Sequence, residues 1–241
     1  SLNKIQQQSF QLDNYTWPSF FWNYYDLRVT LSRWGGKGLY DIPPPVGFSN
    51  ATRIELKYLV YRSPINRFKF DLFPRLRTLK LYRSNLAGPV PSWRSDILQT
   101  MDLRVNALSG TVPAGLFSNP NLKVLDLSDN PGINGTLPMA NLSAIECLHL
   151  HGTSIAGNVP RKYFEDISGL LSLPNSYTNM SSLSSEEPEE CSSDKSVCTY
   201  ANMECQVKKL RDETTAVLCV KKNGNHAACG SFDVNGTWKI G

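Results

Sequence analysis

LKVLDLSDNPGINGTLP (122–138) is the stretch that decides the fold, because the sequence contains four versions of it. The other three copies are LRTLKLYRSNLAGPVP (76–91), LQTMDLRVNALSGTVP (98–113) and IECLHLHGTSIAGNVP (145–160). Each has a pair of apolar residues separated by one position, then a small polar residue, another aliphatic residue, a glycine and a final Val-Pro or Leu-Pro. Counted from the first residue of that pair, the copies lie 22, 24 and 23 residues apart. This regular step predicts a solenoid in which each copy forms one turn.

The apolar pair predicts a short strand in every turn. Side chains alternate along a strand, so the two apolar residues point to one face and the residue between them points to the other. One turn cannot bury its apolar face alone, and stacked turns share a continuous core. Asn106 and Asn130 hold the small polar position in two copies, where an amide can satisfy buried backbone groups between turns. Ser84 and Thr153 hold it in the others and predict a weaker form of the same bond.

The ending of each copy resembles the leucine-rich repeat family, specifically its plant-type repeat, L-x-G-x-(I/V/L)-P, which some protist surface antigens also use. The matching segments are LAGPVP (86–91), LSGTVP (108–113), INGTLP (133–138) and IAGNVP (155–160). The resemblance implies an α/β fold, a right-handed solenoid with a parallel β-sheet on its concave face. Plant members pair cysteines in the N-terminal cap, whereas the first cysteine here is Cys147. We therefore expect an aromatic cap instead, and the alternative is that the aromatic cluster docks on an upstream domain.

Spacing extends the register to about seven turns. Ile54-Glu55-Leu56 and Val29-Thr30-Leu31 lie one and two steps before Leu79, and Leu171-Ser172-Leu173 lies one step after Leu148. The predicted organisation is an aromatic-rich cap (1–26), the solenoid (27–175, best defined over 76–160), an exposed Ser/Glu-rich linker (176–190) and a cysteine-rich C-terminal unit (191–241).

The cysteines predict disulfides and an oxidising compartment. Five of the six crowd into the C-terminal unit, at spacings without the paired C-x-x-C of a zinc ribbon: Cys191, Cys198, Cys205, Cys219 and Cys229. Because five is odd, three alternatives follow. Cys147 pairs with one of the five and pins the tail to the solenoid, one thiol pairs with another chain, or one thiol stays unpaired, as a buried cysteine often does. Six N-x-S/T triplets favour N-linked glycans: Asn14, Asn50, Asn134, Asn141, Asn179 and Asn235. Together these features predict an extracellular or cell-surface protein.

The strand residues that the core does not need form columns on the concave face. Such a row of side chains suits a protein, peptide or glycan ligand, and tyrosine and arginine are over-represented among residues that dominate interfaces. We predict a binding surface made of Lys57, Lys80, Tyr82, Asp102, Arg104, Asp126, Ser128, His149 and His151.

Several other classes of function lack support in the sequence. Cys147, His149 and His151 alternate beside Asp126, but residues two apart on a strand are nearly 7 Å from each other, which is wide for zinc. An ordering hydrogen bond between Asp126 and His149 is the favoured interpretation. Motifs for acyl transfer, phosphate binding or metalloprotease chemistry are absent, so we expect neither an enzyme nor a cofactor. The net charge of +4 does not imply nucleic acid, and no apolar run is long enough to span a membrane.

Two functions fit the sequence. The first is a glycosylated recognition or adhesion module that binds a ligand on its concave face. The alternative is a structural subunit of a surface coat, appendage or matrix, joined through the aromatic end, self-assembly or an intermolecular disulfide.

Overall fold

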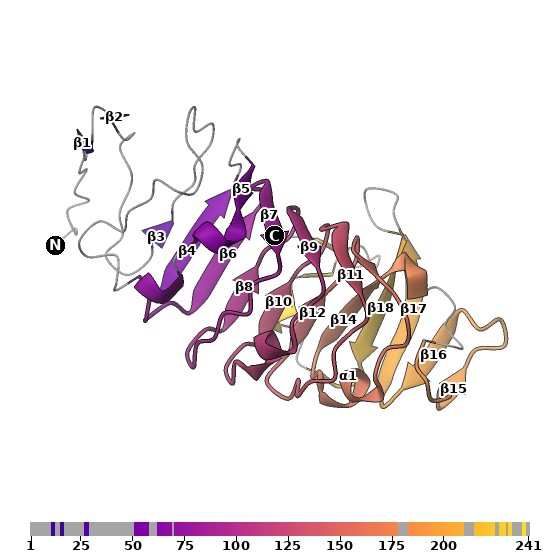
Figure 1. The fold of residues 1–241 in the computed structure, drawn as a ribbon. Coiled ribbons are helices and arrows are strands. Elements are labelled where there is room, and N and C mark those ends of the chain that lie inside the picture. The colour runs from indigo at the N-terminus through magenta and orange to yellow at the C-terminus, as the bar shows by residue number, and fades with distance from the viewer. Residues whose placement is uncertain are drawn as a thin grey trace.

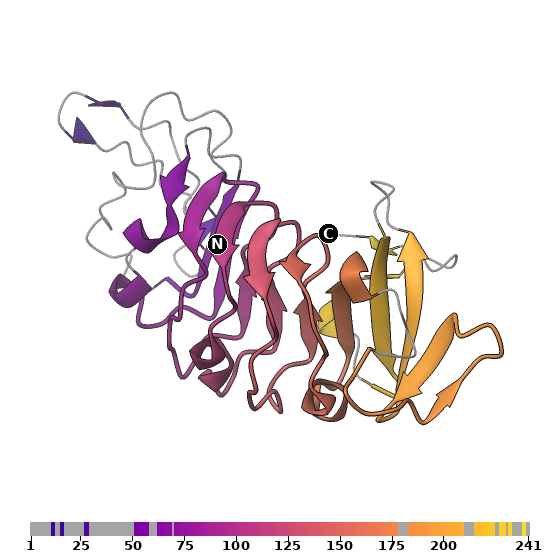
Figure 2. The same ribbon diagram turned by 45° about the vertical axis from the view of Figure 1, so that its right-hand side comes forward.

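The computed structural model describes residues 11–12, 15–16, 27–28, 51–57, 62–68, 70–177, 183–209, 215–224, 227–229, 231–232 and 238–239. Over these residues the chain forms a curved stack of turns with one long sheet along its side (Figure 1). The stack continues into a C-terminal group of longer strands (Figure 2). The leucines of the stacked turns form one buried core, as the repeat predicts.

Parallel strands of the repeat make up the first part of the long sheet. They are β3 (Leu27–Arg28), β4 (Arg53–Lys57), β6 (Thr78–Tyr82), β8 (Thr100–Asp102), β10 (Val124–Asp126), β12 (Cys147–His149) and β14 (Leu170–Pro174). Leu79 lies opposite Met101, Met101 opposite Leu125, Leu125 opposite Leu148, and Leu148 opposite Leu171. The register predicted from the apolar pairs is confirmed for these turns.

The first turn differs from its predicted register. Leu27, rather than Val29, lies opposite Ile54. The segment reads L-R-V-T-L, so a shift of two residues keeps an aliphatic side chain on the same face. Hydrophobic alternation alone could not distinguish the two registers, and residues 29–31 lie outside the described ranges.

The L-x-G segments form a second parallel sheet, which the sequence did not predict. Its strands are β5 (Ser63–Pro64), β7 (Leu86–Pro89), β9 (Ala107–Gly110), β11 (Gly132–Gly135) and β13 (Ser154–Ile155). The motif glycine has a positive φ in every copy: Gly88, Gly110, Gly135 and Gly157. Side chains rarely tolerate this conformation, so the repeated glycine is explained by the backbone of the second sheet.

The predicted bonds of the small polar residues are confirmed. The Asn130 amide donates to the carbonyls of Leu103, Leu127 and Ser128, and its carbonyl accepts from the Leu108 N–H at 3.1 Å. Asn106 does the same one turn earlier. Ser84 and Thr153 each donate a single hydroxyl bond to a backbone carbonyl. Asn119 makes similar bonds, which the sequence analysis did not predict. It accepts from the Ser95 N–H and donates to the carbonyls of Trp93 and Leu116.

Short helices lie on the connections between strands. They are the 3₁₀-helices η3 (Ile65–Arg67), η4 (Phe70–Leu72), η5 (Ala114–Ser118) and η6 (Asn175–Tyr177), and the α-helix α1 (Arg161–Asp166). Two small antiparallel pairs lie near the ends of the chain: β1 (Gln11–Leu12) with β2 (Tyr15–Thr16), and β19 (Ser231–Phe232) with β20 (Trp238–Lys239).

The cysteine-rich unit prolongs the long sheet with antiparallel strands. β18 (Thr215–Lys221) pairs with β14, and beyond it follow β17 (Met203–Lys209), β16 (Val197–Tyr200) and β15 (Glu190–Cys191). The segment predicted as an exposed linker contains buried residues, because Tyr177 and Leu183 join the core and Ser184 bridges to Val159. Its polar composition concealed these few contacts.

Candidate functional site: the concave face

The concave face carries the side chains that point away from the leucine core. The residue between the two apolar positions lies in one row across the strands, and each neighbouring pair in it is in register: Glu55, Lys80, Asp102, Asp126, His149 and Ser172. The column predicted from the sequence is therefore confirmed as a geometric feature. Along it, exposure falls from β4 toward β14.

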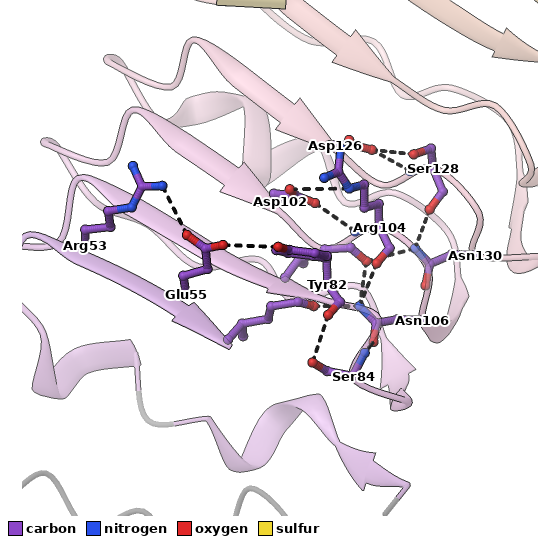
Figure 3. Close-up of polar contacts among 12 residues, drawn as sticks. Arg53, Glu55, Tyr82, Ser84, Asp102, Arg104, Asn106, Asp126, Ser128 and Asn130 are labelled. Carbon is purple, nitrogen blue, oxygen red and sulfur yellow. Dashed lines mark hydrogen bonds and ion pairs between the residues drawn. The ribbon is translucent and has the colours of Figure 1, made fainter. Parts of the chain in front are cut away.

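Arg104 organises the middle of this face. Its guanidinium lies 3.6 Å from a carboxylate oxygen of Asp102 and 3.6 Å from one of Asp126. The same group stacks over the ring of Tyr82, with 5.0 Å between the guanidinium carbon and the ring centroid. Figure 3 shows these side chains side by side on neighbouring strands. Arginine fits this position because its flat cation pairs with carboxylates and stacks on an aromatic ring.

Polar contacts continue toward β4. The Tyr82 hydroxyl donates to Glu55 at 3.1 Å, and the Arg53 guanidinium donates to the same carboxylate at 3.1 Å. Burial opposes ionisation of Glu55, but the bonds from Arg53 and Tyr82 outweigh it and hold the pKa of Glu55 below its usual value. The Tyr82 ring is thus fixed by Glu55 at one end and by Arg104 on one face (Figure 3).

Asp102 is a buried acid beside a second acid. Burial and the neighbouring charge of Asp126 raise its pKa to about 7, although Arg104 acts in the opposite direction. Asp126 is held by Ser128, whose backbone N–H donates at 3.0 Å and whose hydroxyl donates to the same oxygen. Asp102 and Asp126 are therefore bound into the protein's own network.

The face is buried over β12 and β14. His149 and His151 are 5% and 4% exposed, and Ser172 is fully buried. The Ser172 hydroxyl lies 2.9 Å from Nδ1 of His151 and 3.5 Å from Nδ1 of His149. Burial lowers the pKa of His149 to about 4, even though Asp126 favours its charged form.

A disulfide crosses this buried part of the face. Cys147 pairs with Cys229, while Cys191 pairs with Cys198 and Cys205 with Cys219. Of the alternatives that the sequence left open for Cys147, the structure has the one in which it pins the tail to the solenoid. All six cysteines are among the described residues, and none is free. The odd cysteine therefore no longer supports an intermolecular bond.

The nine residues predicted to bind a partner fall into two groups. Lys80, Tyr82 and Arg104 are partly exposed, whereas the rest of the described set is buried: Asp102, Asp126, Ser128, His149 and His151. The Lys57 side chain lies outside the described residues. Spacing predicts the columns but not the exposure of each member, so it could not separate the two groups. The binding role itself stays a prediction.

Two of the predicted glycosylation sites can be located. Asn134 and Asn141 are exposed, and Asn14, Asn50, Asn179 and Asn235 lie outside the described residues. Among the described residues no group of three or more metal-ligating side chains comes together. The described helices are all too short or too polar to cross a membrane.

Comparisons with known proteins point to the plant-type repeat. No family model matches the chain. It is 36% identical over 110 residues to receptor-like protein 9DC1 of Solanum pimpinellifolium, covering 44% of this chain and 13% of that protein. It is 37% identical over 123 residues to receptor-like protein 35 of Arabidopsis thaliana, covering 50% of this chain and 13% of the relative. Over about half of its length the chain is therefore similar to plant receptor-like proteins, which supports an extracellular leucine-rich repeat protein of that type.

This leucine-rich repeat chain spans only about an eighth of the relatives that it matches. Among solved structures, it is similar to the ectodomain of the receptor kinase GASSHO1/SCHENGEN3 of Arabidopsis thaliana in complex with CASPARIAN STRIP INTEGRITY FACTOR 2 (TM-score 0.45, 24% identity, 49% of this chain and 14% of that one). It is also similar to the plant peptide hormone receptor RGFR1 in complex with RGF2 (TM-score 0.40, 20% identity, 50% of this chain and 24% of that one). Three internal disulfides agree with its extracellular or cell-surface location.

Proposed function

We propose that this chain is the ligand-recognition part of a receptor-like protein, and that it binds a protein, peptide or glycan over β4, β6 and β8 of the concave face. The observation that carries the proposal is the position of Tyr82. Its ring is partly exposed and is held between Glu55 and the Arg104 guanidinium. A rigid tyrosine loses little conformational entropy on binding, which makes it an effective anchor for a ligand.

Lys80 supplies a second contact beside this anchor. It lies in register between Glu55 and Asp102 and is partly exposed. Tyr82 offers an aromatic face and Lys80 a mobile cation, a combination suited to a peptide or sugar that has both apolar and polar groups. The relatives are named receptor-like proteins, which favours recognition over a structural role.

The test begins with a selection of peptides from a displayed random library on the immobilised chain. Calorimetry then compares the selected peptides on the wild type, Tyr82→Ala and Lys80→Ala. We expect about a tenfold or greater loss of affinity for Tyr82→Ala, as for a central aromatic anchor. Arg94→Ala is the matched control, because Arg94 is exposed on the connection between β7 and β8.

Arg104 and Asp126 are poor choices for this test. Removing Arg104 would leave Asp102 and Asp126 without their counter-ion, and removing Asp126 would leave Ser128 without its acceptor. Equal affinity in wild type, Tyr82→Ala and Lys80→Ala, or equal loss in Arg94→Ala, would contradict a site on β4, β6 and β8.

A further inference from the structure

The Cys147 side chain lies on the concave face and points away from the leucine core. It alternates with Leu148, which belongs to the core. In register with Cys147 lie Val124 on β10 and Leu170 on β14, and Leu170 in turn lies opposite Val220 on β18. These four residues place an apolar row on a face that is polar over β4, β6 and β8.

Cys229, the last residue of the short helix η8 (Ala227–Cys229), packs on this apolar row. Cys229 joins Cys147, Leu170, Val124 and Val220 in an apolar cluster that is separate from the main core. The sulfur of Cys229 lies 3.7 Å from the carbonyl oxygen of Glu146, and the side chain is 4% exposed. The tail is therefore both packed and covalently bonded against β12.

The route of the chain allows this contact. β18 ends at Lys221 beside β14, and Cys229 follows eight positions later. Neighbouring strands lie about 4.8 Å apart, so the chain must cross roughly 10 Å of sheet from β18 to reach β12. Eight residues span that distance easily. Val220, Leu170 and Cys147 lie in one row of the sheet, so both ends of the crossing are at the level of Leu170.

We propose that Ala227–Cys229 is a clasp that closes the concave face over β12 and β14 and confines the ligand site to β4, β6 and β8. Cys147 and Cys229 are thereby specificity-determining residues: they set how much of the concave face a ligand can reach. The location of the ligand site rests on the proposed function, whereas closure by the clasp can be tested with no ligand at all.

A ligand site restricted to β4, β6 and β8 is short. Three strands span two inter-strand steps, roughly 10 Å, and an extended peptide rises about 3.3 Å per residue. A ligand lying across the strands would touch the face with about three residues. The buried histidines and Ser172 would not contribute.

Histidine labelling tests the clasp directly. The intact protein is treated with diethyl pyrocarbonate, and fragment mass spectrometry follows the modification of His149 and His151. In the wild type both should react at least about tenfold more slowly than a histidine in a free peptide, because labelling then requires a local opening. Cys147→Ser/Cys229→Ser should raise both rates about tenfold or more while the circular dichroism spectrum stays native.

Cys191→Ser/Cys198→Ser provides the control. It removes a disulfide of the same sheet at β15 and β16, away from the clasp, and should leave both labelling rates unchanged. Rapid labelling of His149 and His151 in the wild type would overturn the proposal, even if the variants failed to fold. So would slow labelling in a folded Cys147→Ser/Cys229→Ser variant, since the histidines would then be buried by their own neighbours. Failure of the peptide-binding test alone would leave the clasp standing.

Discussion

The concave face has two parts built from the same repeat, and they differ in the exposure of their outward side chains. On β4, β6 and β8 the described side chains that point away from the core are partly exposed, except Asp102, which is buried beside Arg104. On β12 and β14 the outward side chains are buried and one of them is bonded to the tail. The strand geometry is the same in both parts. The difference lies in residues that the repeat does not constrain, and in one covalent link between distant segments.

Turns of one repeat can share a strand geometry and still differ in the accessibility of their outward face. The leucine pairs specify where a strand lies, and they do so equally well for β6 and β12. They say nothing about whether the opposite face remains accessible. In this chain the substitution of cysteine at position 147 changes an ordinary turn into the attachment point of the tail.

Removing the Cys147–Cys229 disulfide should give the largest change in stability. Cys147 and Cys229 are 82 residues apart, whereas Cys191 and Cys198 are 7 apart. In the chain-entropy model, removing the first disulfide costs about 4–5 kcal/mol and removing the second about 2 kcal/mol. Denaturant unfolding of Cys147→Ser/Cys229→Ser and Cys191→Ser/Cys198→Ser measures both losses. Equal losses would mean that the two parts of the sheet do not differ in how they are held.

Asn130 links the turns of β8 and β10, which lie between the two parts, and its removal should give the second-largest loss of stability. Its amide bonds to Leu103 on the β8 side and to Leu127 and Ser128 on the β10 side. Asn130→Ala removes the bonds to the Leu127 carbonyl and from the Leu108 N–H, which costs about 2–3 kcal/mol. The carbonyls of Leu103 and Ser128 still accept from Asn106 and from the Val105 N–H. Ser84→Ala removes a single hydroxyl bond and should cost about 1 kcal/mol. Thermal unfolding compares the two variants. Similar melting temperatures would contradict the role of Asn130 in linking neighbouring turns.

Asp102 and His149 should give the two parts opposite responses to pH. Burial and the charge of Asp126 place the pKa of Asp102 at about 7 in the folded protein, above its usual 3.8, so its contribution to stability falls as pH rises from about 4 to about 7. Burial places the pKa of His149 at about 4, below its usual 6.5, so its contribution rises with pH over about 4 to 6.5.

Two single variants separate these responses. Relative to the wild type, Asp102→Asn should become more stable as pH rises, whereas His149→Asn should become less stable. The change should be about 1–3 kcal/mol in each, since one pKa unit corresponds to about 1.4 kcal/mol and Arg104 and other neighbours compensate part of it. The measurement is the free energy of unfolding at pH 4, 5.5 and 7.5. Parallel curves for all three proteins would show that neither group is buried in the charge state described.

Sequence reasoning predicted the parts of this fold that depend on local periodicity. The strand register followed from the apolar pairs, and the roles of Asn106 and Asn130 followed from their position after them. The second sheet was missed because two to four residues of L-x-G carry no usable alternation and contain proline. The predicted register of the first strand was wrong by two residues, because L-R-V-T-L is apolar at three alternate positions.

The candidate site was only partly predictable, for a different reason. Its columns were found, because they depend on the same periodicity as the core. The exposure of each member could not be predicted, because the Cys147–Cys229 disulfide, the pairing of β18 with β14 and the ion pair between Arg104 and Asp102 are not encoded in that periodicity. The sequence raised the Cys147 link only as one of several alternatives, since the parity of the cysteines does not say which pair forms.

The smallest expected effects come from deleting one hydroxyl in each part. Tyr82→Phe removes the bond to Glu55 on the partly exposed part, where water can replace it, and should cost about 0.5 kcal/mol. Ser172→Ala removes the partner of His151 Nδ1 in the buried part, where a polar atom left unpaired costs about 1–2 kcal/mol. The free energies of unfolding should therefore differ by about 1 kcal/mol. If Cys147→Ser/Cys229→Ser is then used as the background, water should reach His151 and the Ser172→Ala cost should fall to that of Tyr82→Phe. A cost that stays the same in both backgrounds would mean that the clasp does not keep water from this part of the face.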